Sequence, residues 1–362
     1  MKVIPVEKQM VEVTVWQGLS EPAWGPYRNA HFLVPKKDGK YRFIISAVSA
    51  NRHTLEDTEI PPNIEQFSEA FARLLISSLT DFHSGYDQKM LHEDSRDYMT
   101  FQTAPGMYRP SRLVQGATNL VSAFVRVARK ILNTHLWSIA EILVDDVGVN
   151  APKSRYREKE VEELPGVQRF VMEHLQNLNN VLPDVERAGA TISGEKSDRC
   201  WNGVKIVSFV CGEARRWPQA SKVDKVWNWP WCKNCTECRA VLGLCTYYRI
   251  WIPEYAIVAG PLVPILQKDV ELQWETEEKK PMAILKKALC NASALKRLDV
   301  NDGAGQILVG VDASLEGWGA ILQQEDKNKD RHPCHYESGL WNNAKKRYDV
   351  RKRKYHGLKK GL

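Results

Sequence analysis

Two adjacent carboxylates, Asp145 and Asp146, stand inside the apolar stretch EILVDDVGVN, which covers residues 141–150. Apolar and β-branched residues on both sides of the pair predict two buried strands joined by a turn. Neighbouring negative charges in such a place repel each other and lose hydration, and both effects disfavour the charged forms. The arrangement therefore calls for a partner that offsets the charge, and a shared cation would do so.

A third carboxylate, Asp81, ends a predicted strand in LTDFHSGYDQ and is the natural partner for the pair. Together the three would present hard oxygen ligands of the kind that Mg²⁺ prefers. Two such ions about 4 Å apart stabilise both the attacking and the leaving oxygen of a phosphoryl transfer. The alternative is that Asp145 and Asp146 form a solvated turn, and the dipeptide alone favours that alternative.

The elements that must hold these carboxylates follow from periodicity and turn signals. The predicted strands are 31–35 and 41–45, joined as a hairpin by the basic tip 36–40, then 74–81, the hairpin within 141–150, 204–210 ending in Cys211 and Gly212, 306–311 ending at Asp312, and 319–324. The predicted helices are 117–132, 167–185, most of 217–289, and a basic helix at the end. This order indicates an α+β core, a helical module and the beginning of a second α/β unit.

Composition is that of an ordinary globular protein, with 43% hydrophobic and 26% charged residues in a chain of 362. No apolar run approaches the length of a membrane span, and the N-terminus lacks the apolar segment of a secretory signal. We therefore expect no membrane partner and no secretion. The net charge of +7 is uneven, because residues 342–362 hold nine Lys or Arg and the single acid Asp349. A polyanionic partner is plausible on that ground.

Three cysteines, Cys232, Cys235 and Cys238, have the spacing C-x-x-C-x-x-C, which is compatible with zinc binding. A fourth ligand is not obvious, although Cys245 is near. The segment TECRAVLGLCTYYRIWI also has the pattern of a helix with cysteines on its surface and in its core. That interpretation is favoured, and the other cysteines suggest free thiols in a reducing compartment.

Nine motifs, taken in order, resemble the reverse transcriptase of long-terminal-repeat retrotransposons of the Ty3/gypsy type, and fungal copies most of all. They are FLVPKKDGKYRF, LTDFHSGYDQ, LVQGATNLVSAFVRV, LVDDVGVNAP, RAGATISGEKSDRC, VSFVCG, VLGLCTYYRIWI, VGVDASLEGWGAILQQ and YESGLW. The resemblance runs from about residue 30 to residue 360. A lone Asp pair is a weak signal, whereas this ordered set is a strong one.

The resemblance implies an α+β right-hand polymerase with fingers, palm and thumb, followed by an incomplete RNase H-like α/β unit. The implied domains are an N-terminal extension at 1–29, fingers and palm at 30–215, a helical thumb or connection at 216–300, and a truncated RNase H-like domain at 301–362.

The family's functional residues can be carried over to matching positions in this sequence. The implied metal-binding triad is Asp81, Asp145 and Asp146; the residue proposed to protonate the leaving pyrophosphate is Lys196; the nucleotide-binding residues are Lys36, Arg42, Tyr86, Gln115 and Gly116; the primer grip is Phe209, Val210, Cys211 and Gly212. Tyr86 would exclude a 2′-hydroxyl, although an aromatic there also suits ordinary packing. Tyr247 and Tyr248, in the implied thumb, are expected to pack rather than to bind nucleic acid.

The implied reaction is templated nucleotidyl transfer from a dNTP to a primer 3′-hydroxyl, with two Mg²⁺ ions as cofactors and Mn²⁺ as a possible substitute. The implied partners are an RNA template, a DNA primer, their RNA–DNA hybrid and dNTPs. Contacts to the duplex would be mainly to the backbone and therefore sensitive to salt. The implied location is intracellular, in a cytoplasmic retroelement particle or the nucleus.

Three departures from the family's pattern put polymerase efficiency in question. The aromatic residue expected two positions before Asp145 is Leu143, and the proline expected before Gln115 is Val114. After KYRF the usual acidic and arginine pattern is replaced by residues 45–48, which include Ser46. None of these changes removes a carboxylate of the triad.

The C-terminal unit departs further. Asp312 matches the first metal ligand of an RNase H, but the acid expected in the following helix is Lys354, whose ammonium would repel a divalent ion. Lys345 also stands where fungal copies usually have Glu. The sequence stops at Leu362, before the remaining strands and acids of the pattern. We therefore expect no RNase H activity from this chain, and an unpaired sheet edge in its C-terminal unit.

Three functions from different classes remain open at this point. The first is an active RNA-directed DNA polymerase. The second is a degenerate, non-catalytic retroelement relic that at most binds nucleic acid through its basic face. The third, favoured least, is a zinc-binding nucleic-acid module around Cys232.

Overall fold

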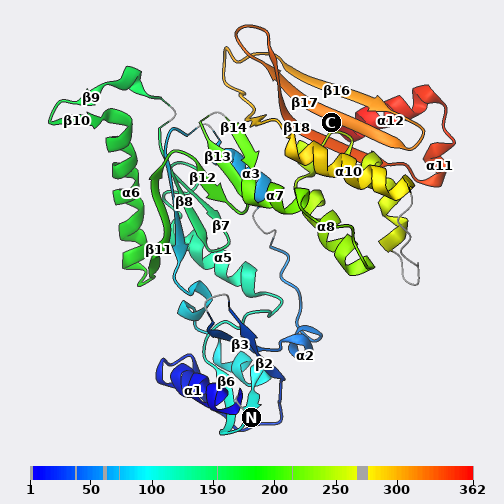
Figure 1. The fold of residues 1–362 in the computed structure, drawn as a ribbon. Coiled ribbons are helices and arrows are strands. Elements are labelled where there is room, and N and C mark those ends of the chain that lie inside the picture. The colour runs from blue at the N-terminus through cyan, green and yellow to red at the C-terminus, as the bar shows by residue number, and fades with distance from the viewer. Residues whose placement is uncertain are drawn as a thin grey trace. The chain divides into compact units, whose positions relative to one another are not determined.

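A computed structural model describes residues 3–36, 39–59, 63–72, 74–152, 154–213, 215–266 and 276–361. The chain divides into two compact units, one made of residues 1–67 and 76–201 and the other of residues 68–75 and 202–362 (Figure 1). Each unit has its own sheets and its own helices, so each is described by itself.

The first unit is built around a four-stranded antiparallel sheet with the order β11-β4-β8-β7. Its strands are β4 (Ser77–Phe82), β7 (Ala140–Leu143), β8 (Asp146–Asn150) and β11 (Ile192–Trp201). The predicted hairpin around the Asp pair is therefore confirmed. The strand predicted for residues 74–81 begins three residues later and includes Phe82, so that Asp81 lies inside it.

Two helices cover one face of this sheet, α5 (Leu120–Ile131) and α6 (Arg169–Arg187). Apolar residues spaced three and four apart on each helix meet alternate residues of β7 and β8. The buried members of this core are Phe82, Phe124, Ala128, Leu132, Ala140, Ile142, Val147, Val149, Leu178, Val181 and Val185. Because side chains alternate along a strand, Asp146 points to the opposite face from Val147, away from this core. Both helices were predicted, with ends that differ by a few residues.

The N-terminal part of the first unit contains smaller elements. These are α1 (Val3–Trp16), the sheet β1-β6-β5 (Ser20–Pro22, Gly106–Pro110, Phe101–Thr103), the hairpin β2–β3 (His31–Pro35, Tyr41–Ile45), α2 (Val48–Asn51), α3 (Ile64–Phe71), which continues into the second unit, and α4 (Glu93–Arg96). A second hairpin, β9–β10 (Glu160–Val161, Leu164–Gln168), precedes α6. The predicted hairpin over 31–45 is confirmed residue for residue, although Lys37 and Asp38 of its basic tip lie outside the described residues.

The second unit begins with the sheet β12-β13-β14-β15 (Val204–Ile206, Phe209–Gly212, Arg215–Pro218, Leu295–Lys296). The single strand predicted for residues 204–210 is wrong, because the chain reverses at Val207 and Ser208, whose φ angles are 40° and 77°. The helices that follow are α7 (Ala220–Trp227), α8 (Cys235–Tyr247), α9 (Tyr255–Ala259) and α10 (Thr276–Cys290), as the predicted helical stretch requires.

The C-terminal part of the second unit is a three-stranded antiparallel sheet with α11 (Asn343–Lys346) and α12 (Val350–Gly361). The strands β16 (Ile307–Ala313), β17 (Gly317–Glu325) and β18 (Arg331–Leu340) follow one another, so β16 is an edge strand of the described sheet. Helix α12 lies against β16 and β17, because Gly357 and Gly361 allow a close approach to Val311 and Ala320. The predicted strand pair and the basic terminal helix are confirmed.

Among the described residues, no helix is both long enough and apolar enough to span a membrane.

Candidate active site

The three carboxylates are brought to one place by strand register. Asp81 of β4 lies directly opposite Asp146 of β8, and residues opposed in this way project from the same face of an antiparallel sheet. Asp145 belongs to the two-residue turn between β7 and β8, and its carbonyl accepts a hydrogen bond of 3.1 Å from the Phe82 N–H. The structure therefore sets Asp81 and Asp146 side by side on the sheet face opposite the α5–α6 core, with Asp145 in the adjoining turn.

The turn that carries Asp145 holds an unfavourable backbone conformation. Val144, its first residue, has a φ angle of 58°. Left-handed φ values suit glycine or asparagine, and they are strained for a β-branched residue because of contacts with its Cβ. Such strain persists only where surrounding structure imposes it, and here Leu143 and Asp146 are paired across the turn while Leu143 is 4% exposed.

The pKa of Asp146 reflects its burial and the negative charges around it. Partial burial, helped by the neighbouring charges of Asp145 and Asp81, raises the pKa of Asp146 to about 6, although Lys196 opposes the change. Burial and the Asp145 charge also raise the pKa of the Tyr86 hydroxyl. A cation placed among these groups would offset the repulsion that adds to burial in both shifts.

Lys196 supplies positive charge on the same face. It comes from β11, where the pairing with β4 is irregular between Ser193 and Asp198, and this irregularity frees its side chain from the regular alternation. Its ammonium lies 3.1 Å from Asp81 Oδ1 and 3.3 Å from Asp81 Oδ2. The contact joins the residue proposed as proton donor to the candidate metal ligands.

Strand β4 is fixed from the core side by a buried polar group that sequence patterns did not single out. His174 of α6 is fully buried, and its Nε2 lies 2.8 Å from the Ser78 hydroxyl. Ser78 Oγ also accepts a hydrogen bond of 3.0 Å from the Cys200 N–H of β11. Burial lowers the pKa of His174, which favours the neutral ring. In the sequence His174 lies in the apolar stripe of the helix. A histidine among apolar residues was the one sign that a buried polar contact is made there.

Tyr86 lies beside the carboxylates in the short helix at Gly85–Gln88. The Tyr86 ring packs edge-on against the Phe124 ring of α5, with 5.2 Å between centroids. The Phe82 ring also packs against Phe124, at 5.5 Å between centroids. Gly85 makes this packing possible, because a Cβ there would lie 2.7 Å from Phe124 Cζ. The structure thus shows the packing role that was one alternative for Tyr86.

The loop with Gln115 and Gly116 is held by an asparagine that sequence analysis missed. Asn51 Nδ2 donates to the Gly116 carbonyl at 2.9 Å, and Asn51 Oδ1 accepts from the Thr118 N–H at 2.9 Å. Gly116 has a φ angle of 94°, which only glycine adopts readily. Gln115 and Gly116 are both exposed. No local pattern marks Asn51, because its partners lie more than sixty residues away.

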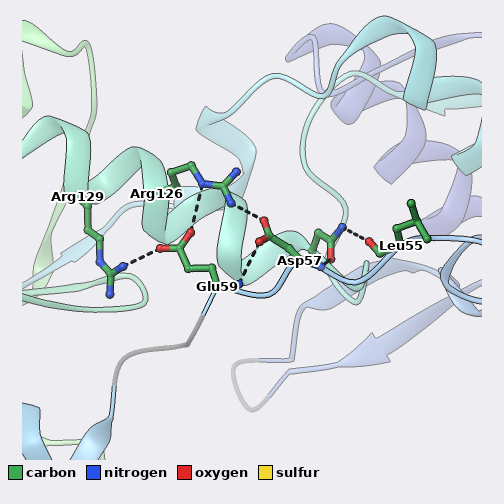
Figure 2. A network of polar contacts seen from close by, with 6 residues as sticks. Leu55, Asp57, Glu59, Arg126 and Arg129 are labelled. Atoms are coloured by element: carbon green, nitrogen blue, oxygen red, sulfur yellow. Dashed lines mark hydrogen bonds and ion pairs between the residues drawn. The ribbon is translucent and has the colours of Figure 1, made fainter.

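A strap formed by residues 51–59 crosses the beginning of α5. Asn119 Nδ2 donates to the Leu55 carbonyl at 2.8 Å, and the Asp57 N–H donates to Asn119 Oδ1 at 2.9 Å. Figure 2 shows two arginines of α5 meeting the acids of the strap: Arg126 reaches Asp57 and Glu59, and Arg129 Nη1 lies 2.7 Å from Glu59 Oε1. The Glu59 N–H and the Arg126 guanidinium hold the pKa of Asp57 below its usual value.

Lys36 and Arg42 lie on the β2–β3 hairpin and are exposed. The hairpin closes through the Lys36 N–H, which donates to the Lys40 carbonyl at 2.7 Å, and Arg42 is opposite Val34. Within the described residues, no contact joins either side chain to the carboxylates. The structure therefore leaves these two predicted residues apart from the triad, and their role stays a prediction.

Phe209, Val210, Cys211 and Gly212 form strand β13 in the second unit. Phe209 is buried against Trp251 at 4.9 Å and Tyr247 at 5.0 Å. The hydroxyls of Tyr247 and Tyr248 bond the Val207 and Ser208 carbonyls in the turn before the strand, the second at 3.0 Å. The two tyrosines thus pack and hold the hairpin, as expected.

Cys235 and Cys238 lie at the start of helix α8, and Cys232 precedes it. The first turn is capped by Asn234 Oδ1, which accepts from the Glu237 N–H at 2.9 Å. Burial raises the pKa of the Cys232 thiol, and it raises the pKa of Cys238 to about 12. Cys235 Sγ donates to the Ile265 carbonyl at 3.1 Å. Over the described ranges, no three His, Cys, Asp or Glu side chains are already arranged around a metal position, here or at the carboxylate triad.

Asp312, the residue matched to an RNase H metal ligand, is near the end of β16 and 77% exposed. Its nearest charged partner is the Lys354 ammonium of α12, at 3.8 Å from Asp312 Oδ1. An acid and an ammonium side by side do not fit a divalent cation, because the ammonium repels the ion. This donor set is therefore unlike that of the first unit, where Asp81 and Asp146 share a face and Asp145 is in the adjoining turn.

Comparisons with known proteins agree with this architecture. Residues 274–362 match the family model of the RNase H-like domain found in reverse transcriptase. The chain is 25% identical over 334 residues to the retrovirus-related Pol polyprotein from transposon 412 of Drosophila melanogaster, covering 91% of this chain and 25% of the polyprotein. It is 23% identical over 330 residues to the transposon Tf2-3 polyprotein of Schizosaccharomyces pombe, covering 91% of this chain and 23% of that one. The chain thus spans about a quarter of the length of these relatives.

Among solved structures, the foamy viral protease–reverse transcriptase in complex with double-stranded DNA matches with a TM-score of 0.82 and 20% identity over 98% of this chain and 59% of that one. The same viral protein in complex with an RNA/DNA hybrid matches with a TM-score of 0.79 and 18% identity over 99% of this chain and 46% of that one. The resemblance found in the motifs is confirmed: the chain is similar to retrotransposon Pol polyproteins, it has the fold of a reverse transcriptase, and its residues 274–362 match an RNase H-like domain.

Proposed function

We propose that this chain is the RNA-directed DNA polymerase of a Ty3/gypsy-type retrotransposon, joining dNTPs to a primer 3′-hydroxyl on an RNA or DNA template. The observation that carries the proposal is the register of β4 and β8, which sets Asp81 opposite Asp146 with Asp145 in the adjoining turn. Asp81 and Asp146 on one sheet face, with Asp145 in the adjoining turn and a pKa of about 6 at Asp146, form an anionic site that Lys196 offsets only in part. Such a site suits a reaction that gathers cations and phosphates.

The donor chemistry of this face fits the two Mg²⁺ ions that the fold family implies, and Mn²⁺ would fit the same oxygens. Asp81, Asp145 and Asp146 would hold them. When bound, the ions supply positive charge for the attacking and leaving oxygens of the transfer. We assign to Lys196, whose Nζ donates to Asp81 Oδ1, the transfer of a proton to the leaving pyrophosphate.

Nucleotide binding is assigned to Lys36, Arg42, Tyr86, Gln115 and Gly116. The Tyr86 ring is fixed against Phe124, and the loop of Gln115 and Gly116 is fixed by Asn51, so both have defined positions before substrate binds. Lys36 and Arg42 are exposed cations on a hairpin and suit the triphosphate. The primer grip is assigned to Phe209, Val210, Cys211 and Gly212.

In right-hand terms, we assign residues 30–215 to fingers and palm, 216–300 to a helical thumb or connection, and 301–362 to the RNase H-like domain, after an N-terminal extension at 1–29. An RNA template, a DNA primer and their hybrid are the proposed partners. Support comes from the viral proteins of the same fold, whose structures hold double-stranded DNA and an RNA/DNA hybrid. A cytoplasmic retroelement particle or the nucleus is the proposed location, as suits a relative of transposon polyproteins.

We further propose that this chain does not cleave RNA in a hybrid. The support is the pairing of Asp312 with Lys354, which puts an ammonium where a metal-dependent nuclease needs another acid. RNA in a labelled hybrid should stay intact in Mg²⁺ or Mn²⁺. Cleavage that depends on metal and is abolished by Asp312→Asn would contradict the proposal.

Primer extension tests the polymerase. Purified protein is given poly(rA)/oligo(dT), dTTP and either Mg²⁺ or Mn²⁺, and the control is the doubly substituted Asp145→Asn, Asp146→Asn chain. Extension by the native chain is expected to exceed that of the control by at least about a hundredfold, since the transfer depends on the charge at the triad. Equal signals from the two proteins would refute the enzyme and leave the alternative, a non-catalytic relic that binds nucleic acid.

A further inference from the structure

A cavity of about 1000 Å³ lies within the first unit, apart from the residues of the proposed polymerase chemistry. Its walls come from four segments of the chain, within residues 26–29, 49–54, 91–99 and 113–123. Among the described residues that line it, none belongs to the carboxylate triad, and Tyr86 is not one of them. Small organic molecules bind in cavities of about 300–1,000 Å³, so this space is large enough for such a ligand.

One wall of the cavity is held together by a buried asparagine. Asn29 is 7% exposed, and its Nδ2 donates to the Tyr98 carbonyl at 2.7 Å and to the Thr100 carbonyl at 3.0 Å. These bonds bring Tyr27 beside Tyr98, and the two rings meet edge to face at 5.0 Å between centroids. Both tyrosines line the cavity and stay partly exposed, so their rings can pack against a planar ligand.

The space between the walls stays open because the backbone around it is fixed and the side chains are short. Asn51 of α2 is hydrogen-bonded to the Gly116 carbonyl, so α2 and the loop at 113–120 keep their spacing. Three alanines line the space and fill little of it: Ala50, Ala117 and Ala123. Met99 and Val114 are buried and add apolar surface. The interior of the cavity therefore suits an apolar ring system.

The charged groups that line the cavity are cationic. Arg28 and Arg52 are exposed, and within the described part of the chain neither guanidinium has a hydrogen bond or an ion pair. His53 adds an imidazole next to Arg52, and no Asp or Glu is among the lining residues that the structure describes. Two acids of the strap are engaged elsewhere, since Asp57 and Glu59 meet arginines of α5. An anionic group is therefore the complement of these two guanidinium groups.

We propose that this cavity, which we call the Tyr27 cavity, binds a free small molecule that consists of a planar aromatic ring system and one carboxylate or sulfonate. Tyr27, Tyr98 and the apolar interior pack against the rings. Arg28 and Arg52 bind the anionic group. Such a ligand is neither nucleic acid nor a dNTP, and its binding does not depend on the polymerase reaction, because the triad takes no part.

The test compares two fluorescent dyes that share one aromatic framework. 1-Anilinonaphthalene-8-sulfonate carries an anion, and N-phenyl-1-naphthylamine is the same framework without it. Each dye is titrated into the full chain without nucleic acid, and the rise in fluorescence gives the Kd. Arg28→Gln and Arg52→Gln should each raise the Kd of the sulfonate about three- to tenfold, because a charge-assisted contact is lost. The Kd of the neutral dye should change by less than about twofold, since it is bound through apolar contact alone.

Arg199→Gln is the matched control, because Arg199 is an exposed arginine of β11 in the same unit. It removes the same charge and should leave the Kd of both dyes unchanged. A sulfonate Kd that rises as much in Arg199→Gln as in Arg52→Gln would mean a general attraction of the anion to a basic protein. That result would overturn the proposal.

Filling the Tyr27 cavity distinguishes it from any other dye site. Ala117→Phe and Ala123→Phe introduce a ring from two different segments, and each should weaken the binding of both dyes at least about tenfold, because the ligand loses the space that encloses it. Circular dichroism and urea unfolding check that the variants fold. A folded variant that binds both dyes as the native chain does would place the dyes elsewhere and refute the site. The arginine variants change exposed positions, so they decide the question even where a filled chain does not fold.

Amide exchange gives the position of the bound dye. Because Asn51 ties α2 to the loop at Gly116, saturating sulfonate dye should slow exchange over residues 49–54 and 113–120 several-fold and leave β4 and β8 unchanged. Slower exchange only in other segments would contradict the assignment. Single-stranded DNA should not displace the neutral dye. Complete displacement would assign the cavity to a nucleic-acid strand and overturn the proposal of a free small molecule.

Discussion

At the scale of single residues, the carboxylate site lowers the stability of the metal-free protein. Asp146 is held where its ionised form is disfavoured, since its pKa of about 6 is above the ordinary value of 3.8. Val144 holds a left-handed backbone beside it. Strained or electrostatically unfavourable residues of this kind cluster at functional sites. Stability alone would favour other residues at both positions.

The raised pKa of Asp146 predicts a pH dependence of stability in EDTA. The folded chain binds the Asp146 proton more tightly than the unfolded chain does. The contribution of Asp146 to the free energy of unfolding is therefore greatest below about pH 4 and is lost as the pH rises through about 6. A pKa shift from 3.8 to about 6 corresponds to a free energy of about 3 kcal/mol. Because Asp146 is partly exposed, solvent screening reduces the expected effect to about 1–2 kcal/mol.

Asp146→Asn should therefore stabilise the metal-free chain by about 1–2 kcal/mol at pH 7.5 and by much less at pH 4.5. Urea unfolding at the two pH values measures this, with Asp302→Asn, an exposed turn residue, as control. A gain that is equal at both pH values would show that Asp146 does not carry the effect.

Gly85 is a second residue whose replacement has a definite expected result. Its Cβ would lie 2.7 Å from Phe124 Cζ and 3.1 Å from Phe82 Cβ, and Phe124 is buried in the core. Gly85→Ala should thus move the Phe124 ring, and Tyr86 with it, and destabilise the fold by about 1–3 kcal/mol. Gly194→Ala, whose Cβ would meet no atom within 4 Å, is the control in the same urea titration. Equal stability of the two variants would exclude the clash.

At the scale of elements, the strap of residues 51–59 couples the N-terminal part of the first unit to α5. Asn51 fixes the Gly116 loop, Asn119 fixes the strap backbone, and two arginines of α5 meet its acids. Because α5 also carries Phe124, the strap and Tyr86 depend on one helix. Long-range polar contacts of this kind order a loop that has little apolar burial of its own.

Removing the arginines should release the strap without unfolding the sheet. In Arg126→Ala, Arg129→Ala, amide exchange over residues 55–59 should become several-fold faster, while β4 and β8 keep their protection. High salt should produce a weaker version of the same change in the native chain, since exposed ion pairs are screened. Arg187→Ala removes an ion pair to Asp184 within α6 and should leave the strap unchanged. Faster exchange across the whole unit would mean that the arginines support global stability instead.

At the scale of the whole molecule, each unit places a lysine beside the aspartate of a strand. Lys196 lies 3.1 Å from Asp81 Oδ1, and Lys354 lies 3.8 Å from Asp312 Oδ1. The surroundings differ, because Asp81 has Asp146 opposite it and Asp145 in the adjoining turn, while the contact described for Asp312 is with an ammonium. The two lysine–aspartate contacts thus differ in their surrounding charge: the first lies among further carboxylates, and the second does not.

The strand pairs were predictable because their signals are local. Alternation and turn residues located β2–β3, β7–β8 and β16–β17 closely. The turn at Val207 and Ser208 had no glycine, proline or asparagine to mark it, and hydroxyls forty residues away help to hold it. The hydrogen bonds of Asn51 to the 116–118 loop and the contact of Lys196 with Asp81 could not be predicted either, because they depend on strand register and on partners distant in sequence.

The strained turn at Val144 has a consequence for variation at this position. Most buried positions reject change, but residue 144 should accept glycine or asparagine at least as well as valine, because both residues tolerate its φ of 58°. Its neighbours Leu143 and Val147 are buried and should reject polar residues. In a saturation mutagenesis library selected for folded protein, position 144 should therefore be permissive, whereas positions 143 and 147 should not.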